Sequence, residues 1–239
     1  LEHVEEAGVH SGDAACVMPP HTLSTAILDR LRQQTTALAL ELGVVGLMNV
    51  QFAIKADTIY LLEVNPRASR TVPFISKAIG HSLPGIATKV MLGKTLKELN
   101  FTREIEINFS AVKESAFPFA RFPGVDAVVG PEMKSTGEVM GIDAEFGMAL
   151  AKSQAGVNAP IPTSGTVFLS VKDEDKRTII LVAHMLHTMG FKLIATRGTA
   201  RVIARNGIPI TEIRRISEGK PNVLDFIINR DVHLIINTP

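Results

Sequence analysis

The sequence predicts a protein of mixed α/β and α+β class that is built from two parts. Residues 49–70 alternate like an antiparallel hairpin, whereas short apolar strands alternate with helices from 166 onward, as in a parallel, doubly wound sheet. Residues 156–165 are rich in Gly, Pro and Ser, a composition typical of a linker. We therefore expect one domain at 1–155, a linker at 156–165 and a second domain at 166–239.

Helix signals surround the hairpin in the first domain. Thr22 or Ser24 can cap a helix that runs to about Leu42, where Gly43 ends it. The other elements expected are helices at 72–79, 83–99 and 143–154, with short strands between 105 and 142 that are broken by Pro118, Pro123 and Pro131. In the second domain we expect strands at 167–171, 191–195, 208–213 and 232–236, and helices at 173–189, 199–205 and 222–229.

The hairpin carries polar side chains on one face. Side chains two residues apart on a strand share a face, so Asn65 joins Glu63. A loop at Ala56 to Thr58 would place Lys55 opposite Ile59, Ala53 opposite Leu61 and Gln51 opposite Glu63.

The residue types on this face indicate a phosphoryl-transfer site. Amide and carboxylate oxygens from Gln51, Glu63 and Asn65 are ligands that Mg²⁺ prefers. Arg67 and Arg70 follow directly, and guanidinium groups bind phosphate or carboxylate. The same alternation could simply belong to a hairpin with one solvated polar face. Arg67 and Arg70 alone would also be ordinary surface charges, and they support a phosphoryl-transfer site only through their position beside the polar face.

Composition narrows the range of functions. Lys plus Arg number 25 and Asp plus Glu 24, and with no Trp and one Tyr nothing indicates a nucleic-acid or membrane partner. Cys16 is the single cysteine, which fits a reducing, cytoplasmic setting. The first residue is not Met, and the last strand stops where a loop should begin. We therefore expect an internal piece of a longer chain, with a truncated second domain and little activity alone.

Three stretches make the chain resemble the carbamoyl-phosphate synthetase large-chain family. They are Gly8-Val9-His10-Ser11-Gly12-Asp13, Glu63-Val64-Asn65-Pro66-Arg67-Ala68-Ser69-Arg70 with Gln51 upstream, and Gly130-Pro131-Glu132-Met133 followed by Ser135-Thr136-Gly137-Glu138. The resemblance covers essentially the whole chain. It implies the C-terminal lobe of an ATP-grasp ligase at 1–155 and part of a methylglyoxal-synthase-like allosteric domain at 166–239.

The resemblance also implies roles for individual residues. In the first domain, ATP with Mg²⁺ or Mn²⁺ would phosphorylate carbamate to carbamoyl phosphate, for arginine and pyrimidine synthesis. Gln51, Glu63 and Asn65 match metal-binding positions, and Arg67 and Arg70 match catalytic ones. The ATP-binding positions are matched by Val9, His10, Ser11, Gln51 and Glu63.

Allosteric positions are implied in the same way. A nucleotide such as IMP or UMP would bind at Ser170, Lys176, Thr196, Thr199, Arg215 and Asn237. The chain departs from the family at Pro239, where the family would have Thr. Ornithine would bind at Glu5, Asp13 and Glu114. The implied partners are a small glutamine amidotransferase subunit and the rest of the large chain.

Two other functions stay open on the sequence. The chain could be a nucleotide-sensing module without catalysis. Thr199 by itself could also simply cap a helix, a role that can coexist with a phosphate contact. The chain could also come from another ATP-grasp ligase, such as a biotin-carboxylase-like protein, although the α/β region after 165 argues against this.

Overall fold

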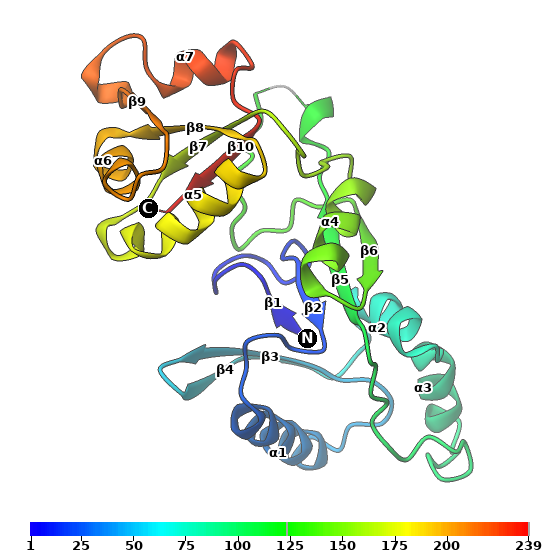
Figure 1. Ribbon diagram of the computed structural model, residues 1–239. Helices are drawn as coiled ribbons and strands as arrows, with labels where there is room; N and C mark the ends of the chain where they lie inside the picture. The colour runs from blue at the N-terminus through cyan, green and yellow to red at the C-terminus, as the bar shows by residue number, and fades with distance from the viewer. Residues whose placement is uncertain (123, 239) are drawn as a thin grey trace. The chain divides into compact units, whose positions relative to one another are not determined.

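The computed structural model describes residues 1–122 and 124–238, so that Pro123 and Pro239 lie outside the described residues. The chain divides into two units, Leu1–Pro160 and Ile161–Pro239 (Figure 1). The division falls inside the stretch 156–165. Within the described ranges, no helix has the length and apolar character that crossing a membrane requires.

The first unit is organised around a four-stranded sheet with the order β1-β2-β5-β6 and antiparallel neighbours. The strands are β1 (Glu2–His3), β2 (Cys16–Met18), β5 (Ser110–Ala116) and β6 (Gly137–Asp143). Neither β1 nor β2 was predicted from the sequence. Both are too short to show an alternating pattern, and the pairing of Cys16 with Lys113 joins segments almost a hundred residues apart.

The predicted hairpin is present as β3 (Asn49–Lys55) and β4 (Thr58–Asn65), but its expected register is only partly right. Ala56 and Asp57 alone form the turn, both with positive φ, so Lys55 pairs with Thr58 and Ala53 with Tyr60. A bulge next to Gln51 then adds one residue to β4 and restores the pairing of Gln51 with Glu63. The two departures from the expected register therefore cancel at the polar face.

Helices of the first unit follow the predicted order, with several boundaries moved. They are α1 (Thr25–Glu41), α2 (Thr71–Ile79), α3 (Leu83–Met91) and α4 (Phe146–Gly156), with a 3₁₀ turn at Phe119–Arg121. Ser24 caps α1 through its side chain, as predicted. The helix predicted at 83–99 ends at Met91 because Gly93 adopts a left-handed conformation. The helix predicted from Asp143 begins three residues later because Asp143 still belongs to β6.

Helix α4 lies against β6 at Gly141, where the two backbones approach closely. A Cβ atom at Gly141 would lie 2.0 Å from the Ala149 carbonyl oxygen and 2.6 Å from the Ser153 nitrogen. Ala149 belongs to the apolar cluster that Val17 and Val112 form beneath α4. A residue without a side chain is therefore required at this position.

The second unit is a four-stranded parallel sheet with the order β10-β7-β8-β9. Its strands are β7 (Thr166–Ser170), β8 (Lys192–Thr196), β9 (Thr211–Ile213) and β10 (Leu234–Asn237). Its helices are α5 (Thr178–Thr188), α6 (Arg197–Arg205) and α7 (Val223–Ile228), with 3₁₀ turns η2 at Asp173–Lys176 and η3 at Ile216–Glu218.

Both faces of this sheet are covered (Figure 1). Val167, Leu169 and Leu193 pack against α5 and α6, whereas Phe168 and Ile194 form a second cluster with Val223 of α7. This arrangement explains why β7 and β8 carry unbroken apolar runs at 167–169 and 193–195 instead of alternating. The strand and helix alternation predicted from 166 onward is confirmed.

Candidate functional site

The polar face of the β3–β4 hairpin brings three predicted metal-binding residues together. Gln51 pairs directly with Glu63, and the Asn65 side-chain amide donates a hydrogen bond of 2.6 Å to Glu63 Oε1. Glu63 is exposed, whereas Gln51 and Asn65 are half-buried. One carboxylate and two amides thus converge at the end of the hairpin that leads into α2.

This set fits a hard divalent cation through its oxygen atoms. Within residues 1–122 and 124–238, no three His, Cys, Asp or Glu side chains are grouped as metal ligands. The hairpin set is of a different kind, with one carboxylate and two amides. In the arrangement described, Asn65 turns its nitrogen toward Glu63, so its oxygen is directed elsewhere and would have to rotate inward to bind a metal.

The two predicted catalytic arginines are held differently. Arg67 is exposed, and its Nη1 donates to the neighbouring Ala68 carbonyl oxygen at 2.9 Å. Arg70 stands at the start of α2, where its Nη1 contacts Met133 Sδ and lies 3.4 Å from Ser135 Oγ. Arg70 is therefore fixed by the segment 130–135, whereas Arg67 is tied only to its own loop.

The same segment also holds the predicted nucleotide-binding residues. His10 donates its backbone N–H to the Gly130 carbonyl oxygen at 2.8 Å, and His10 Nδ1 accepts from the Gly12 N–H at 3.0 Å. A Cβ atom on Gly12 would lie 3.1 Å from Met133 Sδ, so Met133 touches this loop as well as Arg70. Val9, His10 and Ser11 are all half-buried. The segment 130–135 thus joins the predicted nucleotide loop to a predicted catalytic arginine, a role that the sequence analysis missed.

Of the three predicted ornithine-binding carboxylates, Asp13 accepts hydrogen bonds from the protein backbone on both of its oxygens. Its Oδ1 accepts from the Ser135 N–H at 3.0 Å and its Oδ2 from the Lys134 N–H at 2.7 Å. Burial raises the pKa of Asp13, but these hydrogen bonds outweigh it and leave the pKa below its usual value.

Glu5 and Glu114 form a separate, partly desolvated pair. Glu5 accepts from the Ala15 N–H at 2.8 Å, and Glu114 accepts from Gln154 Nε2 at 2.7 Å. Burial raises the pKa of both carboxyls, and the charge of Glu5 raises that of Glu114 further. Glu114 Oε1 also accepts from the Ser115 N–H at 3.3 Å, so both of its oxygens are hydrogen-bonded, as those of Asp13 are. The raised pKa values show that the charges of Glu5 and Glu114 are less well compensated than that of Asp13, so a bound cation would stabilise these two carboxylates more.

The raised pKa of Glu5 predicts an effect of pH on stability. Above the unfolded value of 4.5, the native chain binds this proton more tightly than the unfolded chain does, so native stability falls as pH rises through the folded pKa. Glu5→Gln keeps an oxygen acceptor for Ala15 and removes the charge. We expect the variant to unfold at a higher temperature than the wild type at pH 7.

The comparison should be made by thermal unfolding of the chain at pH 7 and again below pH 4.5. The stabilisation should vanish below pH 4.5, where Glu5 is protonated in both states. Glu6→Gln, which removes an exposed neighbouring charge, is the control. Equal effects of the two variants, or a stabilisation that persists at low pH, would contradict the assignment.

Lys113 is a second residue that the sequence analysis missed. It is fully buried in β5, and its Nζ donates to the Gly12 carbonyl oxygen at 3.2 Å and contacts Ser115 Oγ at 3.3 Å. Cys16 lies opposite it in β2, and burial raises the pKa of that thiol to about 11, which leaves it unreactive at neutral pH. The run Lys113-Glu114-Ser115, which follows the apolar pair Ala111-Val112 in the same strand, was the signal that could have indicated a buried polar cluster.

In the second unit, the predicted nucleotide residues gather at the carboxyl ends of the strands. Ser170 ends β7 and Thr196 ends β8, and their hydroxyl oxygens are 3.3 Å apart. Asn237, at the end of β10, pairs with Ser170. This edge of an open parallel sheet is where such folds bind ligands.

Helix α6 begins at this edge, and its first turn contributes Thr199. The proposed capping role of Thr199 is wrong, since Thr196 is the N-cap residue and Thr199 lies inside the helix. Thr199 is buried, and its Oγ1 accepts from the Val171 N–H at 3.2 Å. It therefore holds the loop after β7 against α6.

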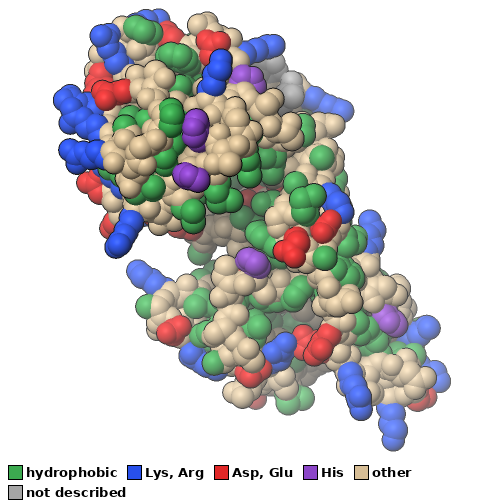
Figure 2. Space-filling model, in the orientation of Figure 1, with side chains coloured by type: hydrophobic (Ala, Val, Ile, Leu, Met, Phe, Trp, Pro, Cys, Tyr) green, Lys and Arg blue, Asp and Glu red, His purple; other side chains and the backbone are tan. Residues whose placement is uncertain are grey.

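The two predicted cations lie at the same edge. Lys176 belongs to η2, and a Cβ atom on Gly198 would be 3.3 Å from Lys176 Nζ, so this ammonium lies over the first turn of α6. Arg215 follows β9 and immediately precedes η3. Figure 2 shows several Lys and Arg side chains over the region of α6, which carries exposed Arg197, Arg201 and Arg205. The edge therefore combines hydroxyls, amide groups and positive charge, a set that suits phosphate.

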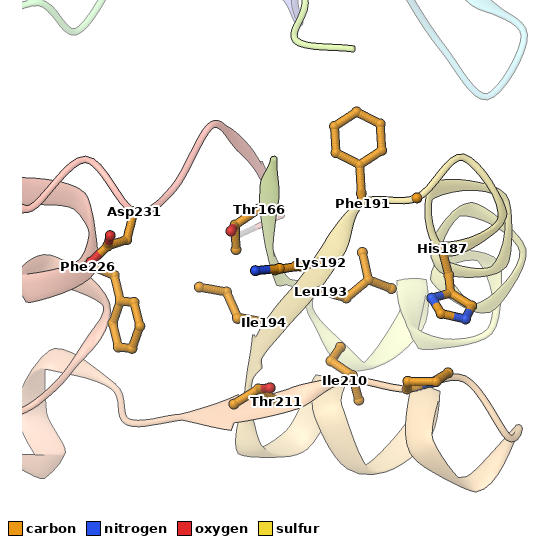
Figure 3. Close-up of a pocket in the computed structure, with 12 residues that line it drawn as sticks. Thr166, His187, Phe191, Lys192, Leu193, Ile194, Ile210, Thr211, Phe226 and Asp231 are labelled. Carbon is orange, nitrogen blue, oxygen red and sulfur yellow. The ribbon is translucent and has the colours of Figure 1, made fainter. Parts of the chain in front are cut away.

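An open hollow of about 790 Å³ lies at the opposite ends of these strands (Figure 3). Thr166, Lys192 and Thr211, the first residues of β7, β8 and β9, line it together with Phe226 and Ile194. None of the predicted nucleotide-binding residues lines this hollow.

Comparison with known proteins defines the class of each region. Residues 2–99 match the family model for the carbamoyl-phosphate synthase L chain, ATP binding domain, and residues 178–239 match the MGS-like domain. The first unit thus contains part of an ATP-binding ligase domain, and the second is MGS-like.

Curated relatives identify the family. The carbamoyl phosphate synthase large chain of Pseudomonas putida is 58% identical over 238 residues, which is 100% of this chain and 22% of the relative. The large chain of Pseudomonas syringae is 57% identical over the same lengths, and that of Methanobrevibacter smithii is 53% identical over 240 residues, 100% of this chain and 22% of the relative. The chain belongs to the carbamoyl phosphate synthase large-chain family and spans 22% of the length of these relatives.

Among solved structures, the biotin carboxylase domain of a single-chain bacterial carboxylase aligns with a TM-score of 0.44 and 17% identity, over 60% of this chain and 37% of that chain. No conclusion rests on so distant a likeness.

Proposed function

We propose that the first unit supplies the metal and phosphoryl-binding part of a site that phosphorylates carbamate with ATP, giving carbamoyl phosphate and ADP. The observation that carries the proposal is the convergence of Gln51, Glu63 and Asn65 on one hairpin face, with Arg70 at the start of the helix that follows. Membership of the large-chain family supports it.

Gln51, Glu63 and Asn65 would hold Mg²⁺ or Mn²⁺, which when bound neutralises the oxygens of the nucleotide phosphates. The other residues act by position. Arg70, held by Met133 and Ser135, would orient the carbamate or the transferring phosphoryl group. Arg67 is held only by its own loop, so its guanidinium would be able to stay with the phosphoryl group during the transfer. No covalent intermediate on the protein is needed, because positioning and electrostatics supply the rate of such transfers.

For the second unit we propose binding of a phosphorylated nucleotide, such as IMP or UMP, as an allosteric effector. The hydroxyls of Ser170, Thr196 and Thr199 and the charges of Lys176 and Arg215 all lie at the carboxyl edge of the parallel sheet, and Asn237 is beside them. We also propose Glu5 and Glu114 as the cation-binding pair of an ornithine site, with Asp13 acting only as a support of its loop.

The remaining proposals follow from the family. In a complete enzyme the chain would act beside the rest of the large chain and a small glutamine-hydrolysing subunit in the cytoplasm. A nucleotide-sensing module without catalysis is the second candidate function. The carboxyl-edge cluster of the second unit favours it, because that cluster does not depend on any residue of the hairpin.

The test is a chimaera of the Pseudomonas putida large chain in which the aligned 238 residues are replaced by this chain. The chimaera should form ATP from carbamoyl phosphate and MgADP, as the parent should. A chimaera that elutes as the parent does in gel filtration and binds nucleotide effector, yet forms no ATP, would leave only the sensing function.

A further inference from the structure

The effector site proposed above contains a carboxylate as well as its cations. Asp173 and Lys176 both belong to η2, and Asp173 Oδ1 forms an ion pair with Lys176 Nζ. Asp173 is almost fully exposed, whereas the Lys176 side chain is only 26% exposed. The lysine is therefore held by its surroundings, and the aspartate reaches it from the solvent side.

The ion pair between Asp173 and Lys176 lies where a phosphate would bind, beside the first turn of α6. Because Lys176 Nζ lies over the first turn of α6 at Gly198, the carboxylate bound to it lies beside that turn as well. Lys176 lowers the pKa of Asp173, and the nearby charge of Arg215 lowers it further, so both cations of the site act on one carboxylate. A phosphate that binds beside this turn would therefore compete with Asp173 for Lys176 and for the charge of Arg215.

We propose that Asp173 is an internal competitor of the phosphorylated effector: it occupies Lys176 in the free chain and must leave when phosphate binds. The inference rests on the proposed effector site in the second unit and names its regulation. The ionised carboxylate mimics the charge, though not the geometry, of one face of a phosphate group. Asp173 therefore sets how much effector is needed for occupancy.

The neighbouring carboxylate provides a matched control. Glu174 lies next to Asp173 in the same 3₁₀ turn and is 86% exposed, but it pairs with Lys172 at 3.7 Å. Asp173→Asn and Glu174→Gln change the net charge equally within one turn of chain. They differ in whether they release Lys176.

The experiment is calorimetric titration of the chain and its variants with inorganic phosphate, IMP and UMP at physiological salt. Asp173→Asn should tighten binding by about two- to five-fold, the effect expected for freeing one cation from an exposed ion pair. Glu174→Gln should leave the dissociation constant nearly unchanged. In a Lys176→Met background, Asp173→Asn should tighten binding much less, because the cation paired with the carboxylate is gone and only the weaker influence of Arg215 remains.

Other outcomes overturn the proposal in distinguishable ways. Equal tightening by Asp173→Asn and Glu174→Gln would show a general charge effect. Weaker binding by Asp173→Asn would show that the carboxylate orients Lys176 or contacts the ligand, and unchanged binding would show no competition. All three results leave the effector site standing. Failure of every variant, the wild type included, to bind any of the three probes would instead remove the proposed effector site itself.

Discussion

In the Pseudomonas putida chimaera, Glu63→Ala should lower ATP formation from carbamoyl phosphate and MgADP by on the order of 10³-fold, the scale seen when one preorganised electrostatic group is lost from an active site. Glu63 is the single carboxylate among the three converging side chains, and it accepts the Asn65 amide. Its removal takes away the charge that would bind a divalent cation and frees Asn65 to turn. Glu63→Gln should retain more activity, because an amide oxygen can still act as a ligand.

Glu41→Ala is the control for this prediction. Glu41 is an exposed carboxylate at the end of α1, so its loss changes the net charge equally without touching the polar face. The two variants should elute alike in gel filtration. If Glu63→Ala forms ATP as fast as Glu41→Ala, then Glu63 is a solvated surface residue and the proposed metal site is wrong.

Gly141→Ala should destabilise the four-stranded sheet of the first unit by about 3 kcal/mol or more, at or above the upper end of ordinary overpacking penalties. The added methyl group would stand 2.0 Å from the Ala149 carbonyl oxygen and 2.6 Å from the Ser153 nitrogen. Both are helix backbone atoms, so no change of rotamer relieves the clash. Helix α4 must move away from β6, which uncovers Val17 and Val112.

Cys16 gives a direct measurement of this loss. It is the single thiol of the chain, it is fully buried in β2, and β2 belongs to the affected sheet. Alkylation of the native chain at pH 7 should be much faster in Gly141→Ala than in the wild type.

Gly137→Ala in the same strand should leave the alkylation rate unchanged, because its Cβ would meet only the Ala116 Cβ at 3.8 Å. Amide exchange of β7 and β8, in the other unit, should be the same in all three proteins. Slow alkylation of Gly141→Ala would mean that α4 is not packed on β6 as described.

The candidate site was predictable where its residues are close in sequence. Glu63 and Asn65 share a face because they are two apart in a strand, and Gln51 lies across a turn of two residues. Even here the expected loop was one residue too long. The bulge beside Gln51 compensated for that error, although nothing in the alternation of side chains had indicated it.

The contacts that fix the arginine and the nucleotide loop could not be predicted in this way. Arg70 is held by Met133 and Ser135, more than sixty residues later, and Asp13 by Ser135, more than 120 residues later. Contacts of this separation leave no periodic trace. For the same reason β1 and β2 were missed, and Asp13 was grouped with Glu5 and Glu114 although its charge is better compensated than theirs.

The sequence by itself determined the order of the helices and of the longer strands, the parallel sheet after 166 and the polar hairpin face, because local periodicity and turn residues record these features. Tertiary structure alone decided which charges meet. It set Arg70 against Met133, buried Lys113 beneath Gly12 and placed Asp173 on Lys176 above α6. The physical reason is that side-chain pairing depends on distances set by packing across segments far apart in the chain, and these distances exist only once the fold has formed.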